Sequence, residues 1–185
     1  MILFFNHLEA PYACVFDIEH DQGRLIQFAG IIFKRVGEGL YQVCRNLNVY
    51  VKQDITPFFK QFSKITQDFL NQYGVSLEEA SALFEQFIQG IEKNEMVFCS
   101  HGVFQDSLIL ERNGIMIKDY PSICTYELAK KVLQRNSHVT VHDLCSESGC
   151  VGMAEHNAYS DAFMAACILS FLLKQGDENY EDVES

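Results

Sequence analysis

Apolar runs rich in strand-forming residues dominate the first part of the chain. They cover residues 12–19, 25–34 and 40–51, and turns around 21–23 and 37–39 separate them. Connections this short join neighbouring antiparallel strands. The pattern therefore predicts a meander of three antiparallel strands. A shorter apolar stretch, residues 2–5, precedes it and predicts either an extra edge strand or a contact with a partner, with the edge strand favoured.

From residue 57 onward, apolar residues recur mainly at helical spacing. Ser76 and Glu79 form a predicted capping box at the start of one helix. The helices are predicted at residues 57–73, 77–92, 103–113, 125–135, 140–148 and 157–174. Buried strands are predicted between them at 95–100 and 121–124. The last helix is expected to stop at Gly176, and the acidic tail, residues 175–185, to be disordered.

This order of elements predicts an α/β fold with a central mixed sheet. Three antiparallel strands come first and parallel strands follow, giving five strands with helices on both faces. The 185 residues suit one domain, which we place at residues 1–174. No uncharged apolar run is long enough to span a membrane. The apolar start lacks a positively charged leader, so no signal peptide is expected.

Charge and cysteine content narrow the function classes. The net charge is −11, and five acids of the tail leave −6 on the body (−11 + 5). A broad basic surface that coats nucleic acid is therefore not expected. An anionic substrate stays possible, because two bound divalent cations would bring the body to −2 (−6 + 4). Seven cysteines without a Cys-x-x-Cys pair favour a reducing, cytoplasmic setting.

Three segments place carboxylates where apolar elements begin or end. Asp17 and Glu19 close the first long strand, and residues two apart on a strand share a face. Asp106 follows the strand at 95–100, and Asp161 begins the last helix, five residues after His156. Taken singly, these residues also fit an exposed strand end, a solvated helix residue and a helix cap. Together, four acids and a histidine are what two-metal hydrolysis of a phosphodiester requires.

With these motifs in place, the chain resembles the DEDDh group of 3′→5′ exonucleases, which have the RNase H-like fold. The order Asp-x-Glu, Asp and then His-x4-Asp matches the three motifs of that family. The stretch 156-HNAYSDA-162 has its His-x4-Asp-Ala spacing, and 25-LIQFAGIIF-33 resembles its second strand. The segments 126-YELAKKVL-133 and 142-HDLCSESG-149 are similar to the approach to its last motif. The resemblance covers residues 12–173.

The resemblance implies a role for each motif residue. Asp17 would bridge two Mg²⁺ or Mn²⁺ ions, and Glu19 and Asp161 would complete the shell of the first. Asp106 would act near the second ion or through a water molecule. His156 would be the general base. The second ion would depend largely on the substrate phosphate.

Several positions that affect substrate preference depart from the family pattern. His20 stands where a small, Thr-like residue is usual, and the second motif reads His101-Gly102. Lys64 replaces a common glycine. We expect His20, His101 and Phe104 to be substrate-binding candidates, with Phe104 stacking a base. His101 also fits a plain loop residue, and Phe104 also fits packing.

The leading functional prediction is a metal-dependent 3′→5′ exonuclease. It would remove nucleoside 5′-monophosphates from the 3′ end of single-stranded nucleic acid. One alternative is an inactive module on the same fold that binds nucleic-acid ends or proteins. Another is a hydrolase of dinucleotides or short oligonucleotides, which a small acidic domain would suit. The sequence leaves DNA versus RNA open, as it does a homodimer or a polymerase, repair or processing partner.

Overall fold

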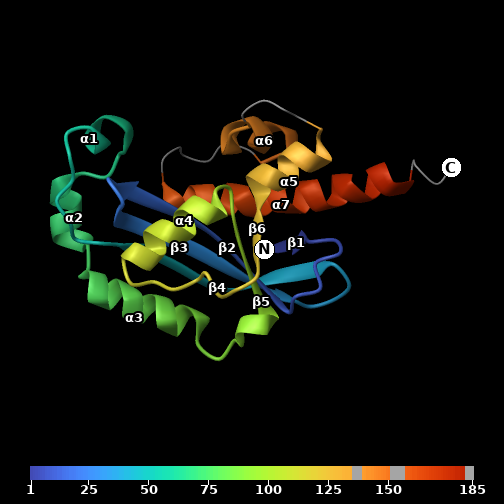
Figure 1. Cartoon of the computed structure of the whole chain (residues 1–185), viewed down its shortest axis with the longest axis horizontal. Helices are drawn as coiled ribbons and strands as arrows, with labels where there is room; N and C mark the ends of the chain where they lie inside the picture. The colour runs from blue at the N-terminus through green and yellow to red at the C-terminus, as the bar shows by residue number, and fades with distance from the viewer. Residues whose placement is uncertain (135–138, 151–156, 182–185) are drawn as a thin grey trace.

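The computed structural model describes residues 1–134, 139–150 and 157–181. Within these residues the chain forms one mixed sheet covered by helices (Figure 1). The strands are β1 (Ile2–Phe4), β2 (Tyr12–Asp21), β3 (Arg24–Arg35), β4 (Leu40–Tyr50), β5 (Met96–Ser100) and β6 (Ser122–Cys124). The helices are α1 (Phe59–Phe62), α2 (Gln67–Tyr73), α3 (Leu77–Ile88), α4 (Val103–Arg112), α5 (Thr125–Val132), α6 (Val141–Glu147) and α7 (Ala158–Glu181), with a 3₁₀ turn at Lys93–Glu95.

The sheet has the order β1-β4-β3-β2-β5-β6. Strands β2, β3 and β4 are antiparallel, whereas β5 and β6 run parallel to β2. The predicted α/β class and the change from antiparallel to parallel strands are thus confirmed. The expected number of five strands is wrong for the described residues, which contain six. The sixth is β1, which pairs with β4 because the buried ring of Phe5 anchors the N-terminal segment beside the sheet.

Two apolar layers enclose the sheet. Helices α3 and α4 pack on one face through residues that include Phe84 and Leu110. Helix α7 packs on the other face through Ala165, Ala166 and Leu169. Figure 1 shows α7 running along one side of the sheet, α3 on the opposite side, and α5 and α6 lying against the outside of α7.

Two helix predictions need correction. The single helix expected at 57–73 is two helices, because Thr66 breaks it and caps α2 by accepting a hydrogen bond from the N–H of Phe69. The last helix does not stop at Gly176 but continues to Glu181. A glycine stops a helix when it adopts a left-handed conformation, and Gly176 is absent from the residues with positive φ. Residues 175–181 of the expected tail thus lie in α7, and 182–185 lie outside the described residues.

A membrane span needs a long apolar helix. Among the described residues, every helix falls short of the combined length and apolar character that such a span requires.

The continuation of α7 can be tested by replacing Gly176 with alanine. A glycine inside a helix is less stable than alanine by about 0.5–1 kcal/mol. A Cβ at Gly176 meets nothing within 4 Å, so Gly176→Ala should raise the free energy of unfolding in urea.

Gly114 provides the matched control. It follows α4 with a φ of +81°, and a Cβ there also meets nothing within 4 Å. Gly114→Ala should therefore lower the free energy of unfolding by about 1 kcal/mol. A loss of stability in Gly176→Ala would show that the helix ends at that glycine instead.

Candidate metal centre and active site

Strand β2 directs its two acidic residues toward α7. Alternate residues of a strand share a face. Ala13 and Val15 pack in the layer that contains α7, so Asp17 and Glu19 continue that face beyond the apolar core. Asp17 and Glu19 are half-buried. A β-bulge lies between Glu19 and His20. The last two residues of β2, His20 and Asp21, follow the bulge and lead into the turn to β3.

The beginning of α7 is fixed beside these carboxylates by polar contacts. The N–H of Ala158 donates to Gln27 Oε1 over 3.2 Å, and Gln27 lies opposite Glu19 in the β2–β3 pairing. Asn157 Oδ1 caps the first turn by accepting from the N–H of Tyr159 at 3.1 Å. Asp161 therefore projects from a helix start that is tied directly to the sheet. One oxygen from each of Asp17, Glu19 and Asp161 lies within 4.8 Å of the others.

Asp106 approaches from the neighbouring parallel strand. Strands β2 and β5 run parallel, so their carboxyl ends meet at the same edge of the sheet. Helix α4 follows β5, and Asp106 is in its first turn. Ser100, the last residue of β5, donates its hydroxyl to Asp106 Oδ2 over 2.6 Å. Asp106 stands outside the close group of three oxygens, but its charge acts on Asp17.

Burial, and for Asp17 and Glu19 also neighbouring negative charge, raises the proton affinity of three of these carboxylates. Burial, followed by the charges of Asp106, Asp161 and Glu19, raises the pKa of Asp17 well above its usual value. Burial and the charge of Asp161 raise the pKa of Glu19 to about 7. Burial raises the pKa of Asp106 to about 6, although the Ser100 hydrogen bond acts in the opposite direction. These groups therefore repel one another when all are ionised.

The donor set fits a hard divalent cation. All of its donor atoms are carboxylate oxygens, which Mg²⁺ and Mn²⁺ prefer. A cation would offset the charge repulsion that, after burial, raises the pKa values of Asp17 and Glu19. The predicted metal residues Asp17, Glu19 and Asp161 are thus brought together, and Asp106 lies on the side of Asp17.

The predicted histidines and Phe104 have different surroundings. His156 lies outside the described residues. His20 is exposed beside Glu19 and accepts a hydrogen bond from the N–H of Gly23 at 3.4 Å. Both ring nitrogens of His101 are engaged within the fold, with Thr125 Oγ1 at 3.1 Å and the carbonyl of Val139 at 2.8 Å. This favours the structural interpretation of His101.

Phe104 projects away from Asp106. The two residues are two positions apart on α4, which turns their side chains about 200° around the helix axis. Phe104 is 74% exposed and lines a separate pocket with Leu108, Ile117 and Tyr120. Its predicted stacking on a base at the acidic site therefore gains no support from this arrangement.

Three positioning residues escaped the sequence analysis. Gln27 and Asn157 fix the start of α7, and Ser100 holds Asp106. Gln27 left a visible signal, since it is a polar residue inside the apolar run 25-LIQFAGIIF-33 and is fully buried. Buried polar groups are hydrogen-bonded, so its presence there implied a fixed polar partner.

A family comparison agrees with this arrangement. The exonuclease family model named for RNase T matches residues 13–169, which include nearly all of β2, all of α4 and the first half of α7. The chain belongs to the RNase T exonuclease family. Comparison with curated protein sequences gives no match.

Solved structures share the fold of this RNase T family chain. A full-length 3′-exonuclease has a TM-score of 0.67 at 13% identity, over 90% of this chain and 83% of its own. Exonuclease X with 5′-overhanging duplex DNA gives 0.65 at 16%, over 89% and 93%. The zinc-bound E. coli exonuclease I complex with single-stranded DNA gives a TM-score of 0.70 at 14% identity, over 94% of this chain but 42% of its own.

The carboxylate cluster predicts a stability that depends on both pH and metal. Without metal, the pKa of Glu19 is about 7 instead of 4.5, and that of Asp106 about 6 instead of 3.8. Both carboxyls therefore hold their protons more tightly in the folded state. As pH rises through this window the unfolded chain ionises first, so metal-free stability falls from about pH 4 to about pH 7.

Thermal unfolding with chelator or with Mg²⁺ at pH 5 and pH 8 checks this expectation. Metal-free protein should melt lower at pH 8 by roughly 5 °C, and Mg²⁺ should raise the melting temperature more at pH 8 than at pH 5. Asp17→Asn should stabilise the metal-free protein at pH 8 and weaken its Mg²⁺ response. An equal Mg²⁺ response at both pH values would contradict the electrostatic account.

Proposed function

We propose that this chain is a 3′→5′ exonuclease of the DEDDh type. It hydrolyses the terminal phosphodiester of single-stranded DNA or RNA and releases a nucleoside 5′-monophosphate. The observation that carries the proposal is the convergence of Asp17, Glu19 and Asp161, with Asp106 beside them, inside a domain of an exonuclease family. The solved structures of similar fold include complexes with overhanging duplex and single-stranded DNA.

In this proposal, one group of residues binds cations and another residue transfers a proton. Asp17, Glu19 and Asp161, with Asp106 on the neighbouring side, would hold two Mg²⁺ or Mn²⁺ ions. Such cations stabilise negative charge on the attacking and leaving oxygens of an in-line displacement. Gln27 and Asn157 fix the start of α7, from which Asp161 projects. The Ser100 hydroxyl fixes the Asp106 carboxylate.

His156 is the general base in this proposal. Its imidazole takes a proton from the attacking water, whose oxygen forms the new bond to phosphorus. The bond between phosphorus and the 3′ oxygen of the preceding nucleotide breaks, and that oxygen leaves as a hydroxyl after gaining a proton. A neutral imidazole suits this role because its usual pKa lies near neutrality.

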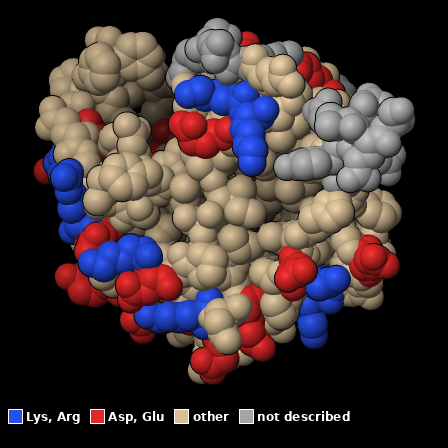
Figure 2. Space-filling model, turned by 45° about the vertical axis from the view of Figure 1, so that its right-hand side comes forward, with Lys and Arg blue, Asp and Glu red and all other residues tan. Residues whose placement is uncertain are grey.

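A second candidate is hydrolysis of dinucleotides or other very short substrates. The net charge of −11 and the surface in Figure 2 favour it. On the described part of that face, Lys and Arg side chains lie beside Asp and Glu and form no continuous basic band. Long polymers usually need several phosphate contacts. Rates measured on substrates of two to twenty nucleotides distinguish the two functions.

The main experiment is cleavage of 5′-labelled single-stranded DNA and RNA of equal sequence, with Mg²⁺, Mn²⁺ or chelator. We expect a ladder shortened from the 3′ end that disappears with chelator. Asp17→Asn should lower the rate by at least ~100-fold, because it weakens the cation site. Asp119→Asn is the matched control, since Asp119 is exposed, forms an ion pair with Lys93 and lies outside the acidic cluster.

The outcomes of this experiment separate the alternatives. Activity on dinucleotides alone would favour the short-substrate hydrolase. No cleavage of any substrate with either metal would overturn the enzymatic proposal and favour the inactive binding module. Equal rates for Asp17→Asn and Asp119→Asn would show that the acidic cluster takes no part in catalysis.

His156→Ala tests the proton-transfer step separately. General-base catalysis contributes typically about 10²–10⁴-fold, so kcat should fall by at least ~100-fold. Oligonucleotide binding and the melting temperature should change little. The measurement is kcat against pH, where the wild-type protein should show an acidic limb that His156→Ala loses. A variant with the wild-type kcat and pH profile would contradict the assignment.

A further inference from the structure

Helix α4 carries a polar residue at each end of the side that meets the sheet. Asp106 lies in its first turn, and Asn113 is the residue that caps its C-terminus. The two are seven positions apart, about two helical turns, so they share one face of the helix. Leu110 lies between them and is fully buried in the layer beneath α4. Asn113 is only 7% exposed, and a buried amide needs partners inside the protein.

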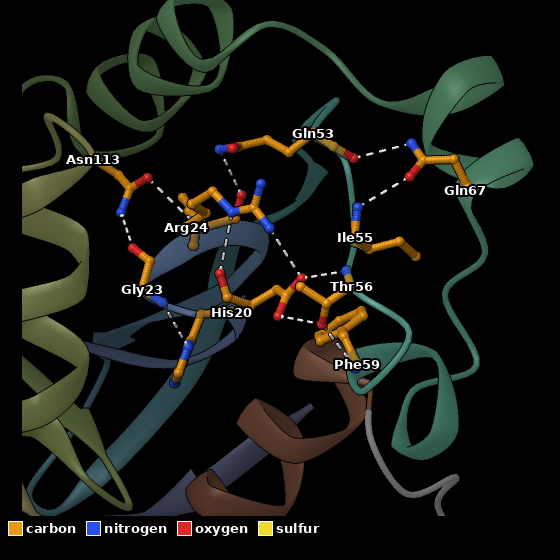
Figure 3. A network of polar contacts seen from close by, with 11 residues as sticks. His20, Gly23, Arg24, Gln53, Ile55, Thr56, Phe59, Gln67 and Asn113 are labelled. Carbon is orange, nitrogen blue, oxygen red and sulfur yellow. Dashed lines mark hydrogen bonds and ion pairs between the residues drawn. The ribbon is translucent and has the colours of Figure 1, made fainter.

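The side-chain amide of Asn113 joins α4 to the turn between β2 and β3. Its Oδ1 accepts a hydrogen bond from the N–H of Leu25 at 3.1 Å, and its Nδ2 donates to the carbonyl of Gly23 at 2.9 Å. Nδ2 also donates to the carbonyl of Ile109 at 2.7 Å, which orients the amide on its own helix. Figure 3 shows Asn113 reaching from α4 toward Gly23. Both partners in the turn are backbone groups, so the bridge does not depend on the side chains of the turn.

The turn itself is held from its other side. Asp21 is 3% exposed, and its carboxylate accepts hydrogen bonds from the N–H of Thr56 at 2.6 Å and from the Thr56 hydroxyl at 2.9 Å. Arg24 forms an ion pair with the same carboxylate at 3.1 Å. In Figure 3 the contact with Thr56 lies on the side of the turn opposite Asn113. The turn therefore offers a fixed point to which Asn113 ties the end of α4.

The other end of α4 has a weaker attachment of its own. Its N-cap is Gly102, which has no side chain to cap the helix. The Ser100 hydroxyl bonds directly to the Asp106 carboxylate at 2.6 Å and so depends on where α4 places that carboxylate. A shift of the helix would therefore move Asp106 relative to Asp17. A displacement of about 1 Å at a reacting centre can lower a rate about 100-fold.

We propose that Asn113 is a positioning residue that holds Asp106 beside Asp17, where the second cation is bound. The inference rests on the proposed exonuclease function. Asp17 and Glu19 come from β2, and Asp161 comes from α7, so these three carboxylates gather without help from α4. Asp106 is the carboxylate that α4 contributes. Loss of the Asn113 bridge should therefore affect the second cation and spare the first.

The kinetic test uses two variants that each remove a hydrogen bond to Leu25. Asn113→Leu removes the amide of α4 and keeps a side chain of similar size. Gln53→Leu is the matched control, because Gln53 Nε2 donates to the carbonyl of Leu25 at 3.2 Å from the segment between β4 and α1. Asn113→Leu should lower kcat roughly tenfold or more and raise the Mn²⁺ concentration for half-maximal rate, with little change in KM. Gln53→Leu should keep the wild-type kcat and Mn²⁺ dependence.

Cation binding is measured without turnover by electron paramagnetic resonance of free Mn²⁺, with adenosine 5′-monophosphate as the probe nucleotide. The wild-type protein and Gln53→Leu should each bind two Mn²⁺ ions. Asn113→Leu should keep the tighter ion and lose the weaker one. Asp106→Asn should show the same loss, and combining it with Asn113→Leu should cause no further change.

The outcomes distinguish this inference from the function on which it rests. An Asn113→Leu protein that melts lower but keeps the wild-type kcat and both ions would overturn the positioning role and leave the exonuclease intact. Equal losses in Asn113→Leu and Gln53→Leu, or a further loss in the double variant, would also overturn it. So would a wild-type protein that binds a single Mn²⁺. Loss of the weaker ion in Asn113→Leu, without cleavage of any substrate by the wild-type protein, would support the positioning role and refute the exonuclease.

Discussion

Mutual repulsion among four carboxylates is the constraint around which this domain is arranged. Asp17 is affected most, because burial and the charges of Asp106, Asp161 and Glu19 all raise its pKa. A fold brings such groups together only if packing elsewhere stabilises them or a cation offsets their charge. Here the stabilisation comes from two apolar layers on either side of β2. The site is therefore built at the end of a strand that both apolar layers hold in place.

The motifs were visible in the sequence because their residues interrupt apolar patterns. Asp17 and Glu19 end a strand, and Asp161 stands in an apolar helix, so both the fold class and the acidic cluster could be predicted. Gln27 was harder to assign, because its partner Ala158 lies far away in the sequence, and the role of Ser100 depends on how β5 and α4 place it against Asp106. Phe104 was proposed because it is close to Asp106 in sequence, but residues two positions apart on a helix point in nearly opposite directions.

The errors in secondary structure have local causes. Residues 57–73 carry apolar residues at helical spacing throughout, but Thr66 caps a new helix and divides the segment. Gly176 resembles a helix stop, yet α7 continues through it. The pattern of residues 2–4 favoured an edge strand but left a partner contact as an alternative. The pairing with β4 shows that they form a strand.

The β-bulge between Glu19 and His20 separates two parts of one strand. Before it, the pairing of β2 with β3 fixes which side chains face α7; beyond it, His20 pairs with Leu25 and Asp21 with Arg24. A bulge absorbs a change of register locally. Substitutions in the turn can therefore change the end of β2 while the strand before the bulge keeps Asp17 and Glu19 in place. The acidic cluster and the turn beside it can consequently change independently during evolution, although adjacent residues encode them.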